Sequence, residues 1–151
     1  MTPRIPARFA VLLLAAAGVL APVRAGAQDS TAAPGAPDQA ARRVFDDVEA
    51  GIRDGDPSAF SHHFGPQVQV NLRGSEGGYL SSGQAYYVLQ HFFAGRRPLG
   101  ARLTTFGDTG GMPYASGNAA FNERGNREAA QIYVSLTRLE GRWTVGQINI
   151  R

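Results

Sequence analysis

Apolar side chains recur at helical spacing in one stretch near the middle of the chain. Ser81 followed three residues later by Gln84 is a capping box, a pattern that marks the beginning of a helix. Gly95, followed by Arg96 and Arg97, marks its end. Between these signals, five apolar residues fall at positions i, i+3, i+4, i+7 and i+8: Ala85, Val88, Leu89, Phe92 and Phe93. The spacing predicts one helix with a single buried stripe.

Two further helices are predicted nearer the N-terminus. Asp38 can cap a helix that runs to about Arg53, and a short helix should begin at Asp56 and end at Gly65-Pro66. The buried stripe of the longer helix comprises Ala41, Val44, Phe45, Val48 and Ile52.

The rest of the pattern predicts strands. Val68, Val70 and Leu72 alternate with polar residues across residues 67–73, which is typical of a half-buried strand. Residues 79–80 are expected to form a short extended piece. The segment after Pro98 predicts four strands, with a glycine-rich loop at residues 107–111 and hairpin turns at 123–126 and 140–141. The four strands are expected at residues 103–106, 114–122, 129–139 and 143–150.

The last strand breaks its own alternation. Trp143 and Val145 share a face, whereas Ile148 and Ile150 are one residue out of phase. A β-bulge near Gly146-Gln147 would bring all four side chains to one side and bend the sheet. The element order is therefore helix, helix, strand, helix and an antiparallel meander, which predicts an α+β fold with the helices packed on a curved sheet.

The first residues have the composition of an export signal. Arg4 and Arg8 precede an apolar run at residues 9–21, and the small residues 25–27 form a cleavage site. The run is shorter than the roughly 20 residues of a membrane-spanning helix. We predict a signal peptide at residues 1–27, a proline-rich disordered linker at 28–37 and one domain at 38–151. The protein is then expected in the periplasm or outside the cell, free of the membrane after cleavage.

Charge and cysteine content exclude several classes of function. The chain has 15 basic and 12 acidic residues, but Arg4, Arg8 and Arg24 leave with the signal, so the mature charges balance. This balance removes the support for a nucleic-acid partner. The absence of cysteine excludes disulfides, a thiol nucleophile and a cysteine metal site. We expect no cofactor.

The order of elements resembles the nuclear-transport-factor-2-like superfamily, also called the cystatin-like cone. Within it, Tyr79-Leu80-Ser81 leading into Gln84-Ala85 and then Phe92-Phe93 is similar to an uncharacterised family of exported bacterial domains. The resemblance covers about residues 40–151. It implies a cone-shaped α+β domain, in which a strongly bent antiparallel sheet packs on three helices of the N-terminal half. It also implies an apolar pocket and a homodimer through the outer sheet face.

The same resemblance leaves activity open. The superfamily contains enzymes similar to ketosteroid isomerase, polyketide cyclases and epoxide hydrolases, which place Asp, His or Tyr side chains inside the cone. No motif of this chain matches one of those sets, and a fold alone does not transfer chemistry.

Five residues are candidates for ligand binding. Tyr87 and His91 are four apart on the predicted central helix, so they share a face and could line a pocket rim; alternatively, they cover the core edge. Asp108 is a lone carboxylate in a glycine-rich segment, where an Asp more often serves the turn. Tyr114 and Trp143 lie on strands, where aromatic residues more often form sheet core or a dimer face.

Histidine does not predict a metal site. His62 and His63 fall on the predicted short helix, where adjacent side chains point about 100° apart and do not share one ion. No HxH or HxxxH spacing is present. We expect one of these imidazoles to pack under the sheet and the other to face water.

The preferred hypothesis is a non-catalytic module that binds a small apolar ligand or a protein partner. The alternative is a small acid–base isomerase or hydrolase that uses a pocket Asp or His with a Tyr. A purely structural role is a third hypothesis.

Overall fold

The computed structural model describes residues 35–75 and 77–151. The predicted signal peptide and most of the predicted linker lie outside these ranges. None of the helices within them is both long enough and apolar enough to cross a membrane.

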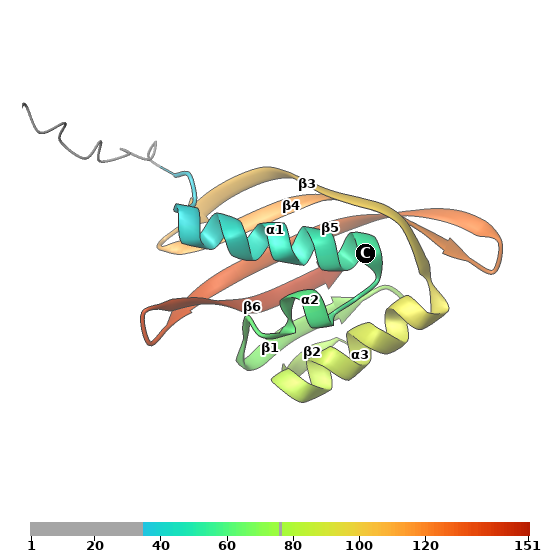
Figure 1. The fold of residues 1–151 in the computed structure, drawn as a ribbon, viewed down its shortest axis with the longest axis horizontal. Helices are drawn as coiled ribbons and strands as arrows, with labels where there is room; N and C mark the ends of the chain where they lie inside the picture. The colour runs from blue at the N-terminus through green and yellow to red at the C-terminus, as the bar shows by residue number, and fades with distance from the viewer. Residues whose placement is uncertain (1–34, 76) are drawn as a thin grey trace, which may run out of the picture. The chain divides into compact units, whose positions relative to one another are not determined.

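Three helices and six strands make up the described part of the chain (Figure 1). The helices are α1 (Gln39–Asp54), α2 (Ser58–Ser61) and α3 (Ser82–Gly95). The strands are β1 (Phe64–Leu72), β2 (Gly78–Ser81), β3 (Arg97–Thr109), β4 (Met112–Glu123), β5 (Asn126–Leu139) and β6 (Arg142–Ile150). The predicted α+β class is therefore confirmed.

Both long helices begin and end as their sequences predict. Asp38 accepts a hydrogen bond from the backbone N–H of Ala41 at 2.7 Å and caps α1, while Gly55 ends it in the left-handed region at φ 71°. All five residues of the predicted α1 stripe are buried. Ser81 and Gln84 form the predicted capping box at the start of α3.

The sheet is mixed, in the order β2-β1-β6-β5-β4-β3. Strands β3 to β6 form the predicted antiparallel meander. β1, however, pairs with β6 in parallel, so the prediction of an antiparallel sheet was wrong at this one junction. The prediction rested on the alternation of apolar and polar residues. This alternation shows which face of a strand is buried, but it does not show which strand lies beside it or in which direction. The strength of the bend stays a prediction.

Two element boundaries also differ from prediction. β3 spans Arg97–Thr109, where a four-residue strand and a loop were expected. It is an edge strand, and an edge tolerates Pro98 and several glycines because one side of it needs no ladder hydrogen bonds. β1 begins at Phe64, so Gly65-Pro66 lies within an irregular part of the strand and does not end α2.

The predicted bulge in β6 is confirmed. Gln147 pairs with Ser135 and Val145 with Leu136, which leaves Gly146 as the extra residue. As a result Val145, Ile148 and Ile150 are all buried on one side of the sheet. An added Cβ at Gly146 would lie 3.0 Å from the Thr137 side chain.

One hydrophobic core fills the space between the helices and the sheet. α1 crosses β3 to β6, and α3 lies against β1 and β2 (Figure 1). At the α3 end the core is aromatic: the Phe92 ring meets Phe93 and Phe121 edge to face at centroid distances of 5.5 Å. Polar residues alternate with the buried ones and form the outer face of the sheet. No polar or charged residue of the described ranges is fully buried.

Candidate functional site

The structure brings only two of the five predicted ligand-binding residues together. Tyr87 and His91 line the same groove, between α3 and the end of β1. Tyr87 is 68% exposed and His91 is exposed beside it. This groove, the α3 groove, has a volume of about 420 Å³. It is lined by Leu72, Ser75, Tyr87, Val88, His91, Phe92 and Arg96.

Asp108 and Tyr114 lie on the β3–β4 hairpin. The Asp108 carboxylate accepts a hydrogen bond from the backbone N–H of Gly111 at 2.8 Å, so Asp108 stabilises the turn. This is the alternative to ligand binding that its glycine-rich surroundings suggested. Tyr114 stacks on Tyr133 on the outer sheet face, with ring centroids 5.9 Å apart. Gly107 leaves room for this ring, since an added Cβ would lie 2.6 Å from the Tyr114 hydroxyl.

Trp143 lies at the β5–β6 hairpin and ties this hairpin to the start of α1. Its indole N–H lies 3.0 and 3.1 Å from the two carboxylate oxygens of Asp38, and the Arg138 guanidinium sits 4.9 Å over its ring. The backbone N–H of Ala41 lowers the pKa of Asp38 below its usual value, and the Trp143 indole adds to the effect. Asp38 is therefore kept ionised, and its carboxylate joins the start of α1 to the β5–β6 hairpin.

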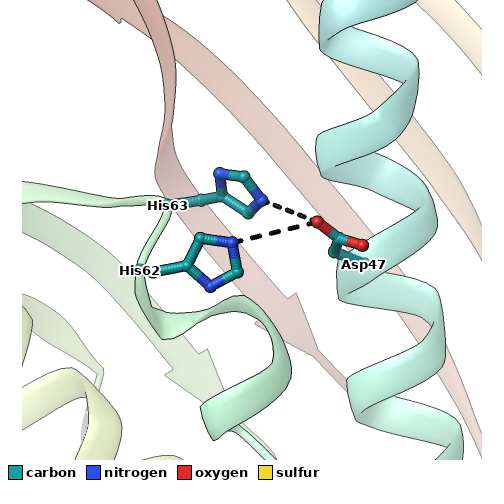
Figure 2. A group of neighbouring side chains, drawn as sticks. All are labelled: Asp47, His62 and His63. Carbon is teal, nitrogen blue, oxygen red and sulfur yellow. Dashed lines mark hydrogen bonds and ion pairs between the residues drawn. The ribbon is translucent and has the colours of Figure 1, made fainter.

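The structure also gathers a cluster that the sequence did not predict: Asp47, His62 and His63 (Figure 2). α2 ends at Ser61, so both histidines lie in the turn that follows it. Their rings point toward the same Asp47 oxygen, with Nε2 of His63 at 2.8 Å and Nε2 of His62 at 4.0 Å. The expectation that the two imidazoles point apart was wrong, because it assumed a longer helix.

A second hollow, the hairpin cavity, opens beside the two histidines. It has a volume of about 430 Å³. His62, His63, Phe64, Arg138, Arg142 and Trp143 are among the residues that line it. A third hollow, of about 400 Å³, lies on the outer sheet face among polar residues such as Ser116, Asn118 and Gln131. The three hollows have similar volumes, so only the chemistry of the residues that line them can indicate which one binds a ligand.

The fold defines the class of protein. A six-strand mixed sheet with three helices is the nuclear-transport-factor-2-like arrangement. The described domain is similar to an NTF-2-like protein of unknown function from Shewanella oneidensis, with a TM-score of 0.51 and 8% identity over 73% of this chain and 94% of that one.

Within that class, the chain belongs to the DUF4783 family, a domain of unknown function whose pattern matches residues 45–151. A DUF4783 protein from Bacteroides ovatus is 17% identical, with a TM-score of 0.60 over 69% of this chain and 90% of that one. Another from Bacteroides uniformis is 11% identical, with a TM-score of 0.62 over 70% and 93%. These likenesses confirm the predicted fold. None of the curated proteins compared with this chain matches it significantly.

Proposed function

We propose that the protein is a non-catalytic binding module that takes a small apolar ligand in the α3 groove. The observation that carries this proposal is the lining of the groove. Leu72, Val88 and Phe92 form an apolar floor, and Tyr87, His91 and Arg96 stand around it. Ligand sites of proteins are typically concave and apolar, with a few polar groups that fix orientation.

The polar groups favour a ligand that carries a hydrogen-bond acceptor on an apolar body. The Arg96 guanidinium sits 4.9 Å over the Phe92 ring, and its Nη2 lies 3.2 Å from Glu123. These contacts fix its position at the edge of the groove. An arginine held in this way can donate to a carbonyl or carboxylate at that edge.

The α3 groove is better suited to this role than the hollow on the outer sheet face. Polar side chains surround the outer hollow, so an apolar molecule would displace water from them without replacing their hydrogen bonds. In the α3 groove the same molecule would cover Leu72, Val88 and the edge of Phe92.

Native mass spectrometry of residues 28–151, purified without denaturation, tests whether a ligand is retained. Anilinonaphthalene sulfonate, an apolar dye with an anionic group, serves as the defined probe. We expect Tyr87→Ala to weaken dye binding about fivefold, as expected for one lost aromatic contact. Tyr79→Ala is the matched control, because Tyr79 is 71% exposed on β2 and does not line the groove. Equal effects of the two changes would refute the proposal.

The acid–base enzyme stays the second candidate, and one observation favours it. His63 and Asp47 form a hydrogen-bonded pair beside the hairpin cavity, the arrangement of an oriented general base. None of the described residues that line this cavity is a tyrosine, so the predicted Tyr partner lacks support. Turnover of an ester or ketosteroid that is lost in His63→Gln would favour the enzyme.

We also propose that the protein is exported and that its outer sheet face forms a homodimer. The support for export is the signal-like pattern of residues 1–27, and the support for the dimer is the resemblance to the superfamily. The same native mass spectrum gives the oligomeric mass. Cleavage of the precursor after Ala27 in an exporting host tests the signal.

A further inference from the structure

We infer that Asp47, His62 and His63 form a binding site for a divalent transition metal of the zinc type. Two imidazole nitrogens and one carboxylate oxygen meet in a space where all three ligand atoms lie within 4.8 Å of one another. This donor set suits Zn²⁺, whereas Mg²⁺ and Ca²⁺ prefer oxygen alone. The inference is independent of the α3 groove.

The distances fit an ion after small movements. Tetrahedral zinc with bonds of about 2.0–2.1 Å holds its ligand atoms about 3.4 Å apart. The two histidine nitrogens lie at 2.8 and 4.0 Å from the Asp47 oxygen, one just inside and one just outside that value. The His62 side chain is 61% exposed, so its ring is free to close the remaining gap.

The fold fixes the backbone positions of the other two ligands. Asp47 lies between the buried Val44 and Val48 on α1. The backbone N–H of His63 donates to the Phe60 carbonyl at 3.0 Å, and its own carbonyl accepts from Val145 at 2.7 Å. Figure 2 shows both rings directed at the carboxylate from the turn between α2 and β1. Little of the chain must be ordered when the ion binds.

Without an ion, the His63 ring donates from Nε2 to Asp47, in the tautomer that carries its proton there. Zinc would take the position of that proton, and the neutral ring would carry its proton on Nδ1 instead. Three protein ligands leave a fourth position open, and the hairpin cavity lies beside both histidines. Water or a small anion can occupy that position, at a cavity that Arg138 and Arg142 also line.

Histidine content makes the test unusually clean. The chain has three histidines and no cysteine, so a protein purified without a histidine tag offers few other ligands. Calorimetric titration with ZnCl₂ near neutral pH should show one saturable site per chain. His62→Gln and Asp47→Asn should each weaken it by at least about tenfold, because even the loss of an outer-shell partner of a metal costs about 10–100-fold in affinity. His91→Gln is the matched control, because His91 lies in the α3 groove, and zinc binding should be unchanged in this variant.

Trp143 gives a second readout that does not depend on calorimetry. It is the only tryptophan of the chain and lines the hairpin cavity with both histidines. Co²⁺ at the site should quench its fluorescence, and Zn²⁺ should reverse the quenching while Mg²⁺ does not. The His62 change is the decisive one, since this exposed residue has little part in folding. Absence of saturable binding, or equal binding by His62→Gln and His91→Gln, would overturn the inference.

Discussion

Truncation of Phe92 to alanine tests the packing of α3 most directly. The residue is 6% exposed, and its ring meets Phe93 and Phe121 edge to face. A buried aromatic side chain removes roughly 150–250 Å² from water, worth about 4–6 kcal/mol at 25 cal/mol per Å². Alanine keeps part of this area, and the adjoining α3 groove lets neighbours and water reach the vacated space. We therefore expect a loss of about 3–4 kcal/mol, within the range typical of Phe→Ala changes in cores.

Urea denaturation, monitored by circular dichroism, measures this loss. The unfolding midpoints of the wild-type and Phe92→Ala proteins can be compared if the free energy of unfolding depends on urea concentration with the same slope in both. Tyr87→Ala on the same helix is the control. Its side chain is 68% exposed, so its free energy of unfolding should change by no more than about 0.5 kcal/mol. A loss below about 1 kcal/mol in Phe92→Ala would show that the buried face of α3 has been assigned wrongly.

Four further predictions use the same urea assay. Asn in place of Asp38 keeps the helix cap without its charge. The hydrogen bond from the Ala41 N–H holds the folded pKa of Asp38 below its usual value of 3.8. The carboxylate therefore stabilises the fold above that pH, and this stabilisation is lost as the pH falls through the folded pKa. Asp38→Asn should make the loss of stability in acid less steep. Deletion of Gly146 should cost about 1–3 kcal/mol, because it removes the bulge that bends β6; a gain in stability would contradict the bulge. Gly117→Ala should cost about 3 kcal/mol or more, since its Cβ would lie 1.9 Å from a backbone carbonyl oxygen of β3. Gly83→Ala, with no atom within 4 Å, should instead stabilise α3 by about 0.5–1 kcal/mol.

Local signals in the sequence predicted the two long helices, the two late hairpin turns and the bulge correctly. The capping box at Ser81 and the stripe of α3 need only neighbours along the chain to be recognised. The turn at Arg124-Gly125 is likewise local, with both residues at positive φ, as a two-residue hairpin requires.

Features that depend on distant parts of the chain could not be predicted. The alternation of β1 shows its buried face but not its parallel pairing with β6. β3 was predicted too short because Pro98 and the glycines of this segment are typical of strand ends and loops. At the Asp47 cluster the missing fact was the end of α2 at Ser61. One turn more of helix would have pointed His62 and His63 in different directions.

The place of β6 in the sheet has a consequence for how the protein folds. It is the last strand along the chain, yet it lies between β1 and β5, near the middle of the sheet. Until β6 has been synthesised, β1 can pair only with β2 and its other edge stays open. Because this contact joins residues far apart in sequence, it should form slowly, and the exposed β1 edge is then a site for pairing with other chains. We therefore expect folding and aggregation to compete at the parallel β1–β6 junction.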